Sequence, residues 1–351
     1  MYSSIASIGI AVPPCCVSQA QAEQFVDKYH AEELLPRSKQ ILHKVLKHPS
    51  IKKRYFAVDN PEVLPVIKQE DPDKRVSRFL HWSRLLGSQA IKSALSKCNL
   101  GISDISALFV NTCTGYICPG ISTYLIEDLG FSNSIKAYDL VGSGCGGAVP
   151  NLQLASQFCL SHPGTIALSV SIEICSATYQ MDNDLSLILS NAIFGDGAAA
   201  VVIWDQPKGV ELVCSDQLFL PEFREHVRYV HKGGQLHNQI SKRLPEIIGN
   251  NVGKFVSKLI SKQNLSLNEI SHFFIHPGGD KILDKCSEVL SISEDKMKLS
   301  RSILEDYGNC SSPSVLFEVN REFEQIKRGQ WGILLSFGAG LSMYGWLLRG
   351  N

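Results

Sequence analysis

The stretch ISALFVNTCTG (residues 105–115) is a short apolar run that ends in a polar turn containing glycine, and a related stretch, ISHFFIHPGG, occupies residues 270–279. Both runs are rich in β-branched and aromatic residues, which is typical of buried strands. The copies start 165 residues apart, and the same offset separates Cys145, in GSGCGGA, from Cys310, in YGNCSSP. The sequence therefore predicts a fold made of two similar halves.

A third pair of similar stretches supports this repeat: FGDGAAAVV begins at Phe194 and FGAGLSMYG at Phe337, in the same order but 143 residues apart. We place the halves at residues 1–205 and 206–351. The hydrophobic pattern of the first half predicts strands and helices in alternation, with strands at 104–112, 134–142 and 165–174 and helices at 120–130 and 148–162. Strands that are apolar throughout indicate a sheet covered on both faces, so two stacked halves predict a five-layered αβαβα sandwich.

Two regions fall outside this alternation. Residues 19–35 are amphipathic and, with the basic stretch 51–55, predict a helical segment appended to the first half. Residues 219–244 contain a proline, three histidines and paired glycines with little periodicity. They predict an irregular insertion that forms part of a pocket wall.

The composition bears on the class of protein. Lysine plus arginine and aspartate plus glutamate each number 34, without long runs of either sign, so nothing indicates a nucleic acid or an acidic membrane as partner. Eleven cysteines lack any CxxC pair and no secretory leader is recognisable, which fits a reducing cytoplasm better than disulfides or structural zinc. No apolar run reaches the roughly 18 residues of a membrane span. We therefore expect a cytoplasmic protein with no bound metal and no membrane insertion.

Cys145 stands among glycines between a predicted strand and a predicted helix. Glycines permit a tight turn, and the free N–H groups at the start of a helix favour a thiolate, so Cys145 is a candidate nucleophile. The alternative is an ordinary buried cysteine, which accounts for the other ten.

Two further polar residues lie at turns related by the repeat. His276 directly follows an apolar strand, and Asn309 precedes the position equivalent to Cys145. Alone, each fits a structural histidine or an ordinary turn asparagine. Because the three turns are expected to converge where the half-sheets meet, the set predicts acyl transfer with carbanion chemistry. The thiolate would hold an acyl group while His276 and Asn309 donate hydrogen bonds to a developing enolate.

The motifs GSGCGGA, FGDGAAAVV, HPGGDKIL and YGNCSSPSV occur in this order, and the chain resembles the type III polyketide synthases, the chalcone synthase relatives of the thiolase fold. The resemblance extends from IKKRY at residue 51 to SFGAGLSMYG at residue 336. It implies the five-layered fold, a homodimer, and a Cys-His-Asn site in which Cys145 is loaded from an acyl-CoA. His276 and Asn309 would then help to decarboxylate malonyl-CoA and stabilise the resulting enolate.

The same resemblance implies which residues surround the substrate. Phe194 matches a gatekeeper between the CoA tunnel and the cavity, although an ordinary core aromatic is the alternative, and Cys118 matches a position that reaches into the partner's pocket. The other implied substrate contacts are Cys113, Thr114, Cys175, Thr178, Ser311, Phe337 and Gly338. Several of these side chains are small or are thiols, which leaves room for an alkyl chain and favours a fatty-acyl starter, as in bacterial alkylpyrone and alkylresorcinol synthases.

The chain departs from the family pattern at three places. A second aromatic gatekeeper is expected near residues 236–238, where the chain has Leu236, followed by histidine and asparagine. The family's Gly-Phe-Gly-Pro-Gly loop is replaced by SFGAG at 336–340, in which Ala339 keeps the N–H group that proline lacks. The basic cluster that faces CoA is recognisable only as Lys52, Lys53 and Arg54, for which a solvated surface run is the alternative.

The leading hypothesis is a condensing enzyme that extends an acyl-CoA with malonyl-CoA and cyclises or releases a short alkylpyrone or alkylresorcinol-type polyketide. CoA thioesters would be its substrates, with no further cofactor. One alternative is a ketosynthase that joins acyl chains in a single condensation, with an acyl carrier protein as partner. Others are a non-catalytic acyl-CoA-binding relative and, remotely, a Cys-His-Asn hydrolase. The HPGGD and GNCSSPSV motifs favour the first, and the complete Cys-His-Asn set argues against a non-catalytic relative.

Overall fold

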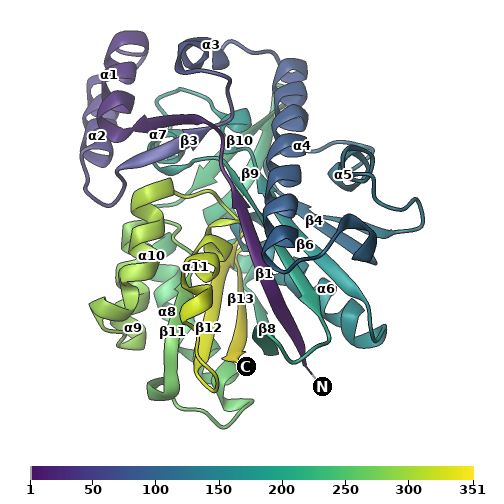
Figure 1. Cartoon of the computed structure of the whole chain (residues 1–351). Helices are drawn as coiled ribbons and strands as arrows, with labels where there is room; N and C mark the ends of the chain where they lie inside the picture. The colour runs from purple at the N-terminus through teal and green to yellow at the C-terminus, as the bar shows by residue number, and fades with distance from the viewer. Residues whose placement is uncertain (1) are drawn as a thin grey trace.

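The computed structural model describes residues 2–351 (Figure 1). Nine strands form one mixed sheet in the order β11-β12-β13-β8-β1-β7-β6-β4-β5. In chain order they are β1 (Ser3–Ala11), β4 (Ala107–Thr112), β5 (Lys136–Val141), β6 (Ile166–Glu173), β7 (Gly197–Trp204), β8 (Val210–Phe219), β11 (Ile270–Ile275), β12 (Trp331–Gly338) and β13 (Ser342–Gly350). The predicted strands of the first half are β4, β5 and β6.

The strand order confirms the predicted repeat. The halves meet where β1 pairs with β8, and outward from this junction they run β1-β7-β6-β4 and β8-β13-β12-β11. In each series the first two pairings are antiparallel and the third is parallel. Only the first half continues with a further parallel strand, β5, at the edge of the sheet.

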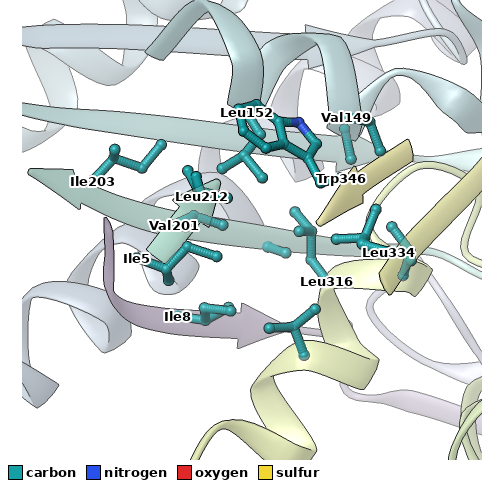
Figure 2. Packing of buried hydrophobic residues seen from close by; sticks show 14 of the residues in the cluster. Ile5, Ile8, Val149, Leu152, Val201, Ile203, Leu212, Leu316, Leu334 and Trp346 are labelled. Carbon is teal, nitrogen blue, oxygen red and sulfur yellow. The ribbon is translucent and has the colours of Figure 1, made fainter. Parts of the chain in front are cut away.

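Helices cover both half-sheets and also lie between them. In the outer layers α4 (Pro72–Lys97) and α5 (Ile121–Leu129) pack on the first half, and α8 (Leu244–Ser261) and α9 (Asp280–Leu290) pack with the second. In the central layer α6 (Ala148–Ser161) and α11 (Ser314–Glu322) share one hydrophobic core with strands of both halves. Figure 2 shows Leu152 of α6 and Leu316 of α11 in this core with Val201 and Trp346. The packing is the predicted five-layered αβαβα sandwich.

Smaller elements build the region beside the site. The predicted segment 19–35 contains one helix, α1 (Gln19–Tyr29), and Pro36 begins a second, α2 (Pro36–Leu46). The two helices lie next to the short strands β2 (Cys15–Ser18) and β3 (Lys53–Phe56) (Figure 1). Further along the chain, α7 (Leu185–Ile193) packs against α2, and α10 (Glu294–Tyr307) precedes α11. No helix in the described range is both long and apolar enough to cross a membrane.

The prediction of an irregular insertion at 219–244 is wrong. Strands β9 (Val227–Lys232) and β10 (Gln235–Ile240) form a β-hairpin with a two-residue loop in this region. Gly233 and Gly234 make its turn with φ of +55° and +74°, the conformation that such hairpins require. Most hairpin residues are half-buried whichever way they point, so the sequence lacks the usual alternation. The predicted contribution of this region to a pocket wall is confirmed.

Candidate active site

Cys145 lies in a single 3-10 turn between the end of β5 and the start of α6. Gly144, with φ of +58°, allows this turn to form. A Cβ atom on Gly144 would lie 2.7 Å from the nitrogen of Ala339, and one on Gly338 would lie 2.3 Å from the oxygen of Ser143. The two glycine-rich turns therefore pack main chain against main chain, which places the SFGAG loop beside Cys145. The N–H group of Ala339 donates to the oxygen of Ser143 at 3.2 Å.

The structure brings the three predicted catalytic residues together. Cys145, His276 and Asn309 line one cavity. The other predicted contacts on its wall are Cys113, Phe194, Ser311, Phe337 and Gly338. The β9–β10 hairpin closes one side with Val227, Arg228, Tyr229, Asn238 and Ile240. Each half of the fold therefore contributes to a single cavity.

His276 and Asn309 are both buried, at 2% exposure. Burial lowers the pKa of His276 to about 4, so its imidazole is neutral at neutral pH. Its Nδ1 is buried without a hydrogen-bond partner in the described chain. The side chain of Asn309 accepts the N–H of Ser311 at 2.8 Å and donates from Nδ2 to the oxygen of Gly278 at 3.3 Å. These bonds fix the amide orientation, while the neutral imidazole is available as a base.

The sulfur of Cys145 is in a largely desolvated environment, with the carboxyl group of Glu173 nearby. Burial raises its pKa to about 11, although the hydroxyl of Ser311, which donates to Sγ at 3.3 Å, acts in the opposite direction. The N–H groups at the start of the helix act in the predicted direction, toward the thiolate, but they do not decide the charge state of the resting thiol. Loss of solvation outweighs the favourable N–H groups. The neutral imidazole of His276, which can accept a proton, lies on the same cavity wall.

Glu173 is a buried carboxylate that the sequence analysis missed, and it binds residues at and behind the cavity wall. Glu173, at the end of β6, accepts hydrogen bonds from the Cys113 N–H at 3.0 Å, the Thr114 hydroxyl at 2.9 Å and the Ser312 hydroxyl at 2.7 Å. Thr114 thus faces Glu173 and is not on the cavity wall, so its predicted role as a substrate contact is wrong. Burial raises the pKa of Glu173. A polar residue ending an otherwise apolar strand was the available sequence signal.

Cys175 and Thr178 line a second, smaller cavity of about 360 Å³ instead of the cavity around Cys145. Phe194 and Asn238 belong to the walls of both cavities and therefore stand between them. The second gatekeeper was expected near residues 236–238, and of these three residues Asn238 is the one that stands between the two cavities. Leu236 lies two residues earlier on β10 and is on neither wall.

Tyr229 is another residue of the wall that sequence analysis missed. It lies opposite Asn238 on the hairpin and lines the main cavity. Burial, together with the nearby thiols of Cys113 and Cys175, raises the pKa of its hydroxyl well above the usual value. It therefore offers a neutral hydroxyl to a substrate. The hairpin itself was not predicted, so the position could not be recognised.

The predicted basic cluster does not act as one surface. Lys52 is exposed and forms an ion pair with Glu305, while Lys53 is partly exposed on β3. Arg54, on the opposite face of that strand, is only 2% exposed and bonds to main-chain oxygens, so its prediction as a CoA contact at the surface is wrong. Cys118 is exposed and lies on neither the wall of the cavity around Cys145 nor that of the smaller cavity beside it.

Comparison with known proteins identifies the family. Residues 2–207 match the chalcone and stilbene synthases, N-terminal domain, and residues 211–351 match their C-terminal domain. A 3,5-dihydroxyphenylacetyl-CoA synthase of Streptomyces toyocaensis is 30% identical over 267 residues, which cover 73% of this chain and 68% of that protein. A 1,3,6,8-tetrahydroxynaphthalene synthase of Streptomyces coelicolor is 29% identical over 256 residues, which cover 72% and 68% of the two chains.

Solved structures of polyketide synthases have the same fold as this chain. The crystal structure of PKS-I from the brown alga Ectocarpus siliculosus matches with a TM-score of 0.92 and 27% identity, covering 100% of this chain and 98% of that one. The type III polyketide synthase domain of Steely1 from Dictyostelium has the same fold, with a TM-score of 0.92, 24% identity, and coverage of 100% and 99%. The chain therefore belongs to the chalcone and stilbene synthase family of type III polyketide synthases, which are condensing acyltransferases.

Proposed function

We propose that this chain transfers an acyl group from acyl-CoA to Cys145 and extends it with carbon units from malonyl-CoA. The observation that carries the proposal is the single wall on which the Cys145 thiol, the His276 imidazole and the Asn309 amide lie together. This arrangement combines a nucleophile, a neutral base and a fixed hydrogen-bond donor in a largely desolvated cavity, where each interaction is stronger than in water. CoA thioesters supply all the carbon, and the proposed steps use no other cofactor.

In the first step the sulfur of Cys145 attacks the carbonyl carbon of the acyl-CoA. Because burial raises the pKa of the thiol to about 11, attack requires proton transfer to a base, and neutral His276 takes this proton. The bond between the acyl carbon and the sulfur of CoA breaks, and CoA leaves with a proton returned by His276. The acyl group remains on Cys145 as a thioester.

In the second step malonyl-CoA loses carbon dioxide, and the electron pair of the broken carbon–carbon bond passes into an enolate of the thioester. Nδ2 of Asn309 and an N–H group of His276 donate hydrogen bonds to the enolate oxygen. The enolate carbon then attacks the acyl carbonyl on Cys145, a carbon–carbon bond forms, and the sulfur of Cys145 is released. Hydrogen-bond donors that are fixed before the reaction stabilise this charge without reorganising.

We further propose a starter with an alkyl chain. A third cavity adjoins the one lined by Cys175 and Thr178, and the two share five wall residues: Arg54, Phe56, Ser176, Tyr179 and Asn191. Its wall is mainly apolar and includes Phe25 and Val26 of α1 and Leu42 and Leu46 of α2. An alkyl chain that passes Phe194 and Asn238 would reach this apolar space, and burial of each methylene group would contribute roughly 0.8 kcal/mol.

A homodimer in which the edges of the two β5 strands lie together is the proposed assembly. The outer side of β5 is a free sheet edge, and Tyr138 and Val141 on it are 51% and 42% exposed. The first turn of α5, which follows Cys118 closely in the chain, packs against this strand, since the N–H of Ser122 donates to Asp139 at 3.1 Å. An exposed sheet edge that carries apolar side chains is typical of a protein–protein interface. A partner subunit bound at this edge would lie next to Cys118, so that Cys118 would approach the partner's pocket. Sedimentation should give the mass of a dimer. A monomer would contradict this assembly.

Product masses test the reaction and the starter together. The protein is incubated with malonyl-CoA alone, with malonyl-CoA plus saturated acyl-CoAs of graded length, and with the same acyl groups on an acyl carrier protein. We expect products that contain the alkyl chain and more than one malonyl-derived unit, formed from the CoA donors. Products from malonyl-CoA alone, with acyl-CoAs ignored, would contradict the alkyl starter and keep the polyketide synthase. A single condensation would support the ketosynthase alternative, and failure to consume malonyl-CoA would overturn both.

A further inference from the structure

Arg54 is buried beneath the active site. Its Nε donates to Oε1 of Gln19 at 3.0 Å, and one Nη donates to the main-chain oxygens of Asn191 at 2.7 Å and Phe194 at 2.8 Å. All three acceptors are uncharged. Burial lowers the pKa of Arg54 to about 10, so the guanidinium remains charged at neutral pH. The guanidinium also lies over the ring of Phe56, 5.1 Å from its centroid, but all its hydrogen bonds go to neutral oxygens. Burial of a cation without a directly bonded carboxylate is costly, so we asked what Arg54 holds in place.

What Arg54 holds is the end of helix α7. The last four carbonyl groups of a helix have no partner within the helix. Here each of the carbonyls of residues 191–194 accepts from another segment: Asn191 and Phe194 from Arg54, Ala192 from Gln19 at 3.0 Å, and Ile193 from the N–H of Asn309 at 2.8 Å. A positive charge at this position also complements the negative end of the helix dipole.

The same contacts determine where Asn309 lies. The N–H of Gly195 donates back to the oxygen of Asn309 at 3.0 Å, so Phe194 and Asn309 form a short parallel bridge between the two halves. The stem of Arg54 packs beneath this bridge: a Cβ atom on Gly308 would lie 2.7 Å from Cγ of Arg54. Loss of the side chain would therefore leave the Phe194 carbonyl without a donor and open a gap next to Asn309.

We propose that Arg54 is a positioning residue that keeps Asn309 and Phe194 in place for the decarboxylation of malonyl-CoA. The inference rests on the proposed function, in which the Asn309 amide stabilises the enolate. A displacement of about 1 Å in a catalytic group costs on the order of 10²-fold in rate. Cys145 is held by a different turn, so acyl loading should be less sensitive to Arg54 than decarboxylation.

The test compares Arg54→Met and Arg54→Lys with the native protein in two assays. One assay measures kcat and KM for the release of acetyl-CoA from malonyl-CoA. The other measures the single-turnover rate of Cys145 acylation by intact mass. We expect Arg54→Met to lower the decarboxylation kcat by about 10²-fold with KM within about threefold and acylation within about fivefold of native. Arg54→Lys keeps the charge and can reach one carbonyl, so it should recover about tenfold of the lost kcat.

Arg75→Met is the matched control. Arg75 is also buried and binds main-chain oxygens, including those of Ile67 and Tyr179, but it does not contact the Phe194–Asn309 bridge. It should change both assays by similar factors. Native kcat in a folded Arg54→Met variant, or an equal loss in both assays as for Arg75→Met, would overturn the inference. If the Met variant does not fold, Arg54→Lys decides the matter by the same ratio. Absence of decarboxylation by the native protein would instead count against the proposed function.

Discussion

Cys145 and Cys310 occupy equivalent turns of the two halves, and each precedes one of the two central helices, α6 and α11. Cys145 is partly exposed to the cavity, whereas Cys310 is fully buried, with its sulfur 3.6 Å from the main-chain oxygens of Asp196 and Tyr307. The duplicated fold therefore presents one thiol and hides the other. The second turn contributes its neighbours Asn309 and Ser311 to the cavity instead.

Replacing each cysteine in turn gives the largest contrast. Cys145→Ala should abolish the acyl-enzyme and lower polyketide formation by more than about 10³-fold, because no other group forms the thioester. Cys310→Ala should keep activity within about twofold and lose about 1 kcal/mol of folding stability. Intact mass after incubation with acyl-CoA, product formation and thermal melting check these outcomes. Normal turnover by a folded Cys145→Ala variant would contradict the nucleophile assignment.

His276, which the second half contributes to the cavity, should act mainly on a different step from Cys145. His276→Gln removes the base and one enolate donor, and it should lower malonyl-CoA decarboxylation by about 10²–10³-fold. Acyl loading should fall by a smaller factor. Separate measurements of acetyl-CoA release and of Cys145 acylation distinguish the two effects. Equal losses would show that His276 acts mainly by activating the thiol.

Ser311 links the two turns directly, because its hydroxyl donates to the sulfur of Cys145 at 3.3 Å. This hydrogen bond lowers the pKa of the thiol against the larger effect of burial. Ser311→Ala should therefore raise the pKa further and slow alkylation of Cys145 by iodoacetamide about threefold to tenfold near pH 8. Peptide mass mapping across a pH series gives the rates, with Cys310 as an internal reference that stays unmodified. A faster reaction in the variant would be inconsistent with this role.

A further expected effect, on stability instead of rate, concerns His276 and its equivalent in the repeat, Asn111. Asn111 is buried with both side-chain ends bonded, to Ser312 at 2.9 Å and to Ser171 at 2.6 Å, whereas Nδ1 of His276 lacks a partner. Burial lowers the pKa of His276 from 6.5 to about 4. Between these pH values the unfolded chain binds a proton that the folded chain does not, so the folded state loses stability as the pH falls from 6.5 to 4.

His276→Asn should remove this acid sensitivity. Relative to the variant, the native protein should lose on the order of 2 kcal/mol of unfolding free energy between pH 7 and pH 5. Denaturant titrations at both pH values measure the difference between the two proteins. Buried Glu173, Asp196 and Glu318 have raised pKa values and act in the opposite direction, but they are present in both proteins. Parallel curves for the two proteins would argue against a neutral, buried His276.

Much of the fold could be predicted because similar strand and turn sequences recur in the two halves at a fixed offset. The strands β4 and β6 are short, mostly apolar runs that end at polar residues, whereas β5 contains Lys136 and Asp139 and is largely exposed. The three catalytic candidates stand directly after strands or in turns. The hairpin β9–β10 could not be predicted in the same way. Its residues are half-buried on both sides, so no periodic pattern marks its strands.

The environment of individual side chains also could not be predicted from the sequence. Arg54 stands in a basic run, and only the alternation of β3 turns it inward toward α7 while its neighbours stay near the surface. The charge state of Cys145 depends on how deeply the cavity buries the sulfur, which is set by segments far apart in the chain. Thr114 likewise faces Glu173 because of the register between β4 and β6.

The bridge between Phe194 and Asn309 limits how the passage between the cavities can widen. The main chain on both sides of Phe194 is hydrogen-bonded, from Phe194 N to Ser190 at 3.0 Å and from Gly195 N to Asn309 at 3.0 Å. A swinging loop would have to break these bonds, whereas rotation of the phenyl ring about its own side-chain torsions breaks none. Entry to the inner cavities is then a matter of ring rotamers, which exchange far faster than segments of main chain rearrange.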